Sequence, residues 1–102
     1  MITIEKLKTI LLKGDLAVLK TALKNYNINE CDKFGNTILH LAVMEQQYEA
    51  FSYLIEKGAD VNAQNTHGNS VLSVAIFNYK KNPSLYNKMI EILLKHNANP
   101  HL

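Results

Sequence analysis

Arginine and tryptophan are absent from this chain of 102 residues, and the chain has one cysteine, two prolines and four glycines. All 11 basic residues are lysines, so the planar guanidinium that binds phosphate and guanine through two parallel hydrogen bonds is missing. The lysines are scattered, with only Lys80 and Lys81 adjacent, and the formal net charge is +2. Composition and charge therefore argue against nucleic acid or an anionic membrane surface as a partner.

A single cysteine, Cys31, excludes a disulfide bond within the chain and is typical of a reducing compartment. The first residues lack the apolar core of a signal peptide, and no apolar run approaches the roughly 20 residues of a membrane-spanning helix. We therefore expect a cytoplasmic protein, or one delivered without a cleavable signal peptide, and no membrane partner. The length fits one domain, and an apolar fraction of 47% is ordinary for a folded protein.

Two segments of the chain superimpose at an offset of 33 residues. Residues 32–42 return as residues 65–75, so that Gly35, Asn36, Leu39 and Ala42 recur as Gly68, Asn69, Leu72 and Ala75. A period in this range marks a stacked array in which no unit can bury its apolar face alone. Arrays of this kind usually present a surface to another macromolecule.

Apolar residues at helical spacing predict a pair of helices in each unit. Thr3 is the expected N-cap of the first helix, and the apolar faces of the first pair comprise Ile4, Leu7, Ile10 and Leu11, then Leu16, Val18, Leu19, Ala22 and Leu23. In the second unit we expect Gly35 to take positive φ, Thr37 to cap the next helix and Gly58 to end the helix after it. The last helix is expected at about 84–95.

The third unit contains an insertion between its two helices. Ala42 lies 12 positions before Leu54, whereas the equivalent Ala75 lies 18 positions before Leu93. Six extra residues therefore fall around Asn78 to Pro83.

These units resemble the ankyrin repeat. The opening signature of that family, Asp-x-x-Gly-x-Thr-Pro-Leu-His-x-Ala, is matched by Asp32, Gly35, Thr37, Leu39, His40 and Ala42. Its closing segment, Leu-Leu-x-x-Gly-Ala-Asp-x-Asn, is matched by Leu54, Ile55, Gly58, Ala59, Asp60 and Asn62. The third unit departs by placing Ser70 and Ser73 where the second has Thr37 and His40. The first unit lacks the opening signature, as a terminal capping repeat would.

The resemblance implies an all-α ankyrin-repeat solenoid of about three helix-turn-helix units joined by β-hairpin-like loops. Residues 1–102 would form a single domain. The expected boundaries are about 3–31 for a capping first repeat and 32–64 for the second repeat. Residues 65–102 would form the third repeat, with the six-residue insertion and a C-terminal cap.

No catalytic, metal-binding or cofactor motif stands out. In ankyrin repeats the equivalent of His40 bonds within its own turn and ties Thr37 to the neighbouring loop, so the resemblance implies a structural role. The enzymatic alternative is a Cys31–His40 dyad oriented by Asp32, which requires a cleft. A metal site at His96 and His101 is the other alternative, and it lacks a cluster of cysteines or carboxylates. We expect no enzymatic activity, no cofactor and no metal.

The resemblance further implies that hairpin tips and first helices line a concave face that binds a partner protein. In the second repeat the candidate binding residues are Lys33, Phe34, Asn36, Met44 and Glu45. In the third repeat they are Thr66, His67, Asn69, Phe77 and Asn78, and the insertion adds a second patch with Tyr79 and Lys80. We expect these positions to be free of packing demands. Phe34 is the strongest candidate, since an exposed phenylalanine can anchor a partner; the alternative is that its ring folds back over the neighbouring hairpin.

The sequence therefore predicts a noncatalytic protein-protein interaction module that inhibits, sequesters or tethers a target protein, for example in a toxin-immunity or effector-type role. We expect a monomer rather than a homo-oligomer. The alternative is a structural or assembly protein that self-associates through its C-terminal helix, where Met89 and Ile92 are expected to expose apolar surface.

Overall fold

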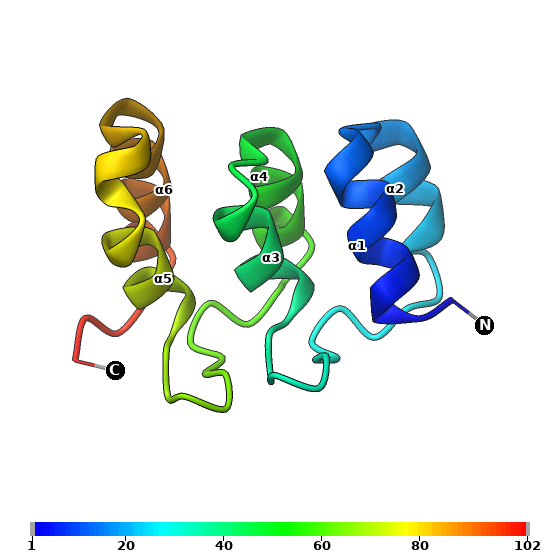
Figure 1. The fold of residues 1–102 in the computed structure, drawn as a ribbon, viewed down its shortest axis with the longest axis horizontal. Coiled ribbons are helices and arrows are strands. Elements are labelled where there is room, and N and C mark those ends of the chain that lie inside the picture. The colour runs from blue at the N-terminus through cyan, green and yellow to red at the C-terminus, as the bar shows by residue number, and fades with distance from the viewer. Residues whose placement is uncertain (1, 102) are drawn as a thin grey trace.

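The structure is a computed structural model of the chain and describes residues 2–101. Its six α-helices form three pairs, which are α1 (Ile4–Lys13) with α2 (Leu16–Ala22), α3 (Ile38–Met44) with α4 (Tyr48–Glu56), and α5 (Val71–Phe77) with α6 (Pro83–Lys95). The pairs stand side by side in chain order, with α1, α3 and α5 in one layer and α2, α4 and α6 behind them (Figure 1). The predicted all-α repeat fold is confirmed.

The loops that join successive pairs project to one side of the helices (Figure 1). In the second and third repeats, Oδ1 of Asp32 and of Asn65 each accepts hydrogen bonds from two backbone N–H groups further along its own loop. Gly35 and Gly68 follow with φ of 78° and 76°. The two loops thus share one geometry, as the 33-residue offset predicts.

Hydroxyl side chains begin the first helix of every repeat. Thr3, Thr37 and Ser70 each accept a hydrogen bond from the backbone N–H three residues later. Serine can replace threonine here because the cap needs only the hydroxyl oxygen. Gly58 follows α4 with φ of 88°. The predicted caps are therefore present, and Asp15, which the sequence did not single out, caps α2.

The six-residue insertion forms a 3-10 helix, η1 (Tyr79–Lys81), and the turn that leads into α6. Asn82 then caps α6 by accepting the Leu85 N–H through its side chain. The insertion therefore lies where the spacing placed it, and it is an ordered turn.

Three predictions about the core are wrong. Val18 is 46% exposed, because its side of α2 faces away from the second repeat, and no described residue covers it. Met89 is fully buried, because its position on α6 faces the second repeat. Leu94 is 48% exposed although the spacing grouped it with the core. Ile92 is partly buried and packs against the core.

Candidate protein-binding surface

A shallow hollow of about 330 Å³ lies between the second and third repeats. Seven of the residues expected to bind a partner line it, namely Phe34, Asn36, Met44, His67, Asn69, Phe77 and Asn78. Asn65 and Val74 complete the lining and were not predicted. Residues that lie 31 to 44 positions apart in the sequence, such as Phe34 and Phe77, thus meet at one site.

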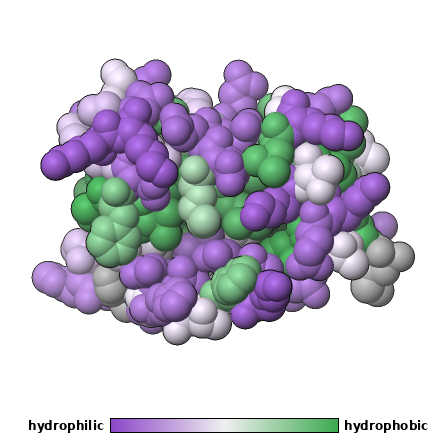
Figure 2. All heavy atoms as spheres, viewed as in Figure 1, coloured by the Kyte–Doolittle hydropathy of each residue, from purple (hydrophilic) through white to green (hydrophobic). Residues whose placement is uncertain are grey.

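Large apolar side chains stand exposed around this hollow. The exposed fraction is 53% for Phe34, 37% for Met44 and 72% for Phe77. On the face formed by the first helices and the loops, hydrophobic residues gather in a band between hydrophilic rims (Figure 2). Exposed aromatic and methionine side chains that gather on one face are typical of protein interfaces.

The exposed residues recur at one position of the repeat. Met44 and Phe77 are 33 residues apart and both end the first helix of their repeat. In the first repeat, Gly14 has positive φ, as Gln46 does in the second, and each donates its N–H to the carbonyl three residues earlier. Counted back from these turns, Leu12 is the equivalent of Met44. Leu12 is 49% exposed, and we call Leu12, Met44 and Phe77 the apolar ladder.

Leu12 was missed at the sequence level. The offset between the first and second repeats is 32 residues at this point instead of 33, and the first repeat lacks the opening signature. The signal that could have found it is the end of the first helix, because aligning Gly14 with Gln46 brings Leu12 onto Met44.

The Phe34 ring stands half exposed at the edge of the hollow. The ammonium of Lys33 lies 5.2 Å from the ring centroid, within the range of a cation–π contact. The backbone carbonyl of Phe34 accepts two hydrogen bonds from Thr66, one from its N–H at 2.9 Å and one from its hydroxyl at 2.8 Å. The backbone of the tip is therefore fixed while half of its ring remains available.

Some of the candidate residues also hold the two loops together, so the expectation that they are free of packing demands is wrong for them. Asn36 is only 8% exposed, and its Oδ1 accepts a hydrogen bond from Asn65 Nδ2 at 3.0 Å. Asn69 places its carbonyl on the ring of His40. Neighbouring loops contact each other closely, and polar side chains between them must be paired.

His40 is fully buried and both of its ring nitrogens are engaged. Nε2 lies 3.0 Å from the Asn69 carbonyl oxygen, so it carries the proton and donates. Nδ1 then accepts from the backbone N–H of Thr37 at 3.2 Å. Burial lowers the pKa of His40 below its ordinary value of 6.5, although the Asn69 carbonyl opposes this shift. The predicted structural role of His40 is confirmed, and its ring cannot serve as the base of a Cys31 dyad in this arrangement.

Comparison with known proteins agrees with this geometry. The family described as ankyrin repeats, in three copies, matches residues 7–102. The chain belongs to the ankyrin repeat family. Ankyrin repeats are protein-protein interaction modules and are generally noncatalytic.

Similar ankyrin proteins come from animals, bacteria and viruses. The chain is 40% identical over 65 residues to ankyrin repeat domain-containing protein 13C-B of Xenopus laevis, which is 64% of this chain and 13% of that protein. It is 43% identical over 53 residues to ankyrin repeat protein YahD of Escherichia coli K12, 51% of this chain and 26% of that protein. It is 38% identical over 64 residues to OPG023 of cowpox virus, 63% of this chain and 9% of that protein. The matches thus span only a small part of these relatives.

The remaining candidate residues lie outside the hollow. Lys33 and Thr66 are exposed on the ankyrin hairpins, and Glu45 follows Met44 as the C-cap of α3. Tyr79 is 37% exposed in η1, next to the exposed Lys80. The insertion patch therefore adjoins the ladder at Phe77 and does not line the hollow.

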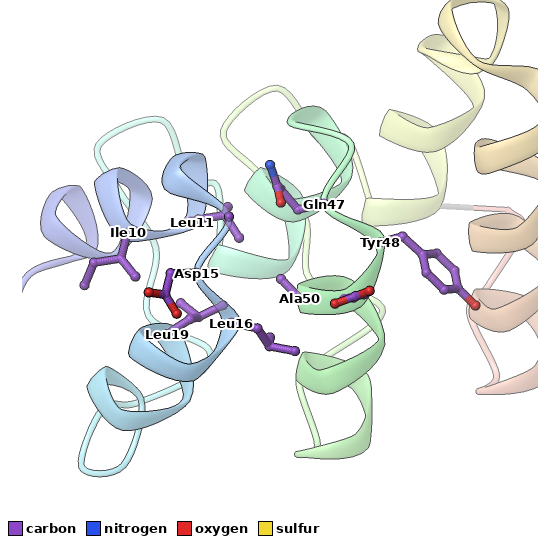
Figure 3. A pocket seen from close by; sticks show the side chains of 10 residues that line it. Ile10, Leu11, Asp15, Leu16, Leu19, Gln47, Tyr48 and Ala50 are labelled. Atoms are coloured by element: carbon purple, nitrogen blue, oxygen red, sulfur yellow. The ribbon is translucent and has the colours of Figure 1, made fainter.

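A second hollow, of about 340 Å³, lies between the first and second ankyrin repeats. Leu11 and Leu19 face Ala50 across it, whereas Tyr48 points away (Figure 3). Asp15 stands at the same site, and its carboxylate is used to cap α2. This hollow is a gap in packing between two repeats, lined mainly by apolar side chains.

The outer face of the third ankyrin repeat carries two exposed apolar residues, Ile76 and Leu94. By the repeat offset they correspond to Val43 and Ile55, which are 0% and 7% exposed because the third repeat lies against them. No described residue covers Ile76 and Leu94 in the same way. This face keeps the stacking character of the repeat in front of it.

Within residues 2–101, no group of three or more His, Cys, Asp or Glu side chains could hold a metal ion. In the same part of the chain, no helix is long and apolar enough to cross a membrane.

Proposed function

We propose that the chain binds a target protein through the apolar ladder and the hollow between the second and third repeats. The observation that supports this most is the recurrence of exposed apolar side chains at one position of all three repeats. Packing inside the solenoid does not require them there, since each is at least 37% exposed. A standard interface covers roughly 800 Å² per partner, a small share of the total surface of 6055 Å².

The mechanism is occupancy. Hydrogen bonds between the hairpins fix the surface before a partner arrives, so little ordering entropy is lost on binding. A rigid surface of this kind can block, sequester or tether a target without chemistry. Inhibition in a toxin-immunity role and an effector-type role are the forms of this function that we propose to test. Loss of protection against a co-encoded toxin after gene deletion supports the immunity form, and unchanged protection contradicts it.

The test of binding is an affinity pull-down from native cells with the wild type and a Met44→Asp, Phe77→Asp double variant. The matched control is Val18→Asp, which introduces the same charge at an exposed apolar position of α2, outside the ladder. Thermal unfolding first establishes that all three proteins fold equally. A stoichiometric partner that is retained by the control and lost from the double variant supports the proposal. A partner retained by the double variant contradicts the proposed surface.

The outer face of the third repeat favours a second candidate, self-association through Ile76 and Leu94. Sedimentation equilibrium of the wild type and Leu94→Asp distinguishes it. A mass that rises with concentration only in the wild type supports assembly, and a monomer at all concentrations contradicts it.

A further inference from the structure

The spacing of the apolar ladder restricts the partner that fits it. Packed helices lie about 8–10 Å apart, so successive rungs on α1, α3 and α5 are separated by about that distance. In a partner α-helix, residues seven positions apart are about 10.5 Å apart and lie nearly on one face. In an extended segment the same distance takes about three residues, and those residues point to opposite faces. A helix laid across the three first helices therefore presents one apolar side chain to each rung.

The charges beside the ladder favour one sign of partner. Lys13 directly follows Leu12, Lys33 lies at the Phe34 ring, and Lys80 and Lys81 follow Phe77 in η1. Glu45 is the one acidic residue that directly follows a rung.

The nearby aspartates do not oppose these lysines effectively. Asp32 accepts two backbone N–H groups within its hairpin, and Asp15 caps α2. Among the described residues that line the hollow, none is acidic. The surroundings of the ladder are therefore basic, and they attract a partner that carries carboxylates.

We infer that the target segment is an acidic amphipathic helix. Its apolar side chains recur about every seven residues and contact Leu12, Met44 and Phe77, while its carboxylates face Lys13, Lys33, Lys80 and Lys81. This inference rests on the proposed function and adds the chemistry of the partner.

The test is selection from a displayed library of random 18-residue peptides on the full chain. We expect the recovered peptides to be net acidic, to be helical when bound, and to repeat apolar residues at seven-residue spacing. For a recovered peptide, Met44→Asp should weaken binding about 30-fold, the effect of losing one central apolar anchor. A Lys33→Glu, Lys80→Glu variant should weaken it about tenfold at low salt and less at high salt. Val18→Asp is the matched control and should leave binding unchanged.

Recovered peptides that are basic, uncharged or extended overturn the inference, and so does a selection that enriches nothing. If such peptides still lose binding in Met44→Asp, the proposed binding surface stands and only the acidic helix is wrong. If Met44→Asp does not affect binding, the ladder is not the site, and both the inference and the proposed surface fail.

Discussion

The two junctions between repeats are built from different residues at equivalent positions. Tyr86 and Met89 of α6 face the second repeat, and Gln47 and Ala50 occupy the same positions on α4, facing the first. Tyr86 is fully buried and donates a hydrogen bond from its hydroxyl to the Val43 carbonyl at 2.8 Å. Ala50 ends at its β-carbon, and the second hollow remains beside it. Large side chains close one junction, whereas a small one leaves the other incompletely packed.

The loops repeat this difference. Between the second and third repeats, Thr66 bonds Phe34, Asn65 bonds Asn36, and the His40 ring bonds the Asn69 carbonyl. Between the first and second repeats, the Asp60 N–H donates to Asn29 Oδ1 at 2.8 Å. The first repeat lacks the opening signature that forms the other hairpins. The candidate surface is thus centred on the more tightly connected junction, as a surface that binds without rearrangement requires.

The largest expected effect comes from emptying the tight junction. Met89→Ala removes a fully buried side chain and leaves a cavity, so we expect the free energy of unfolding to fall by about 2–5 kcal/mol. Urea denaturation measures this loss. The matched control is Val18→Ala at the exposed equivalent position, which should change stability by less than about 0.5 kcal/mol. Equal effects at the two positions would contradict the assignment of Met89 to the junction.

The next effect compares two glycines of the same conformation. Gly68→Ala introduces a β-carbon at positive φ with open space around it, at a cost of about 1–2 kcal/mol. Gly35→Ala adds the same strain and also places the β-carbon 2.6 Å from the Thr66 backbone nitrogen. We therefore expect Gly35→Ala to lower the free energy of unfolding clearly more than Gly68→Ala. Equal losses in urea denaturation would show that the hairpins are not in close contact.

Much of this fold could be predicted from the sequence, because repeat signals are local. The Gly35 and Gly68 turns and the Thr37 cap depend on residues a few positions away. Burial at the ends of the array could not be predicted in this way, because helical spacing marks Val18 and Leu94 as apolar without showing whether a neighbouring repeat covers them. Asn36 was misjudged for a related reason, since its partner Asn65 lies in the next repeat.

A smaller effect should appear on acidification. Burial lowers the pKa of His40 below 6.5, so the unfolded chain binds this proton more readily than the folded chain. The free energy of unfolding should therefore be undiminished above 6.5 and fall as the pH drops from 6.5 towards the lower pKa of the folded state. Urea denaturation at several pH values tests this. His40→Ser, which copies Ser73 of the third repeat, should flatten the change, and an unchanged pH dependence would contradict the role of His40.

The smallest effect is a gain at the looser junction. Ala50→Met copies Met89 and extends a side chain into the hollow beside Leu11 and Leu19. We expect the free energy of unfolding to rise by about 0.5–2 kcal/mol, as cavity-filling substitutions commonly give. A loss of stability would mean that the hollow is too narrow for the longer side chain.

Native-state hydrogen exchange tests most directly whether the candidate surface stands on the rigid part of the solenoid. Amide protection reports the free energy of local opening for each helix. We predict that amides of α1 and α2 exchange through openings of lower free energy than those of α3 and α5, with Ala50→Met reducing the difference. Openings of α3 and α5 that are as easy as those of α1 and α2 would contradict a preformed binding surface at the second junction.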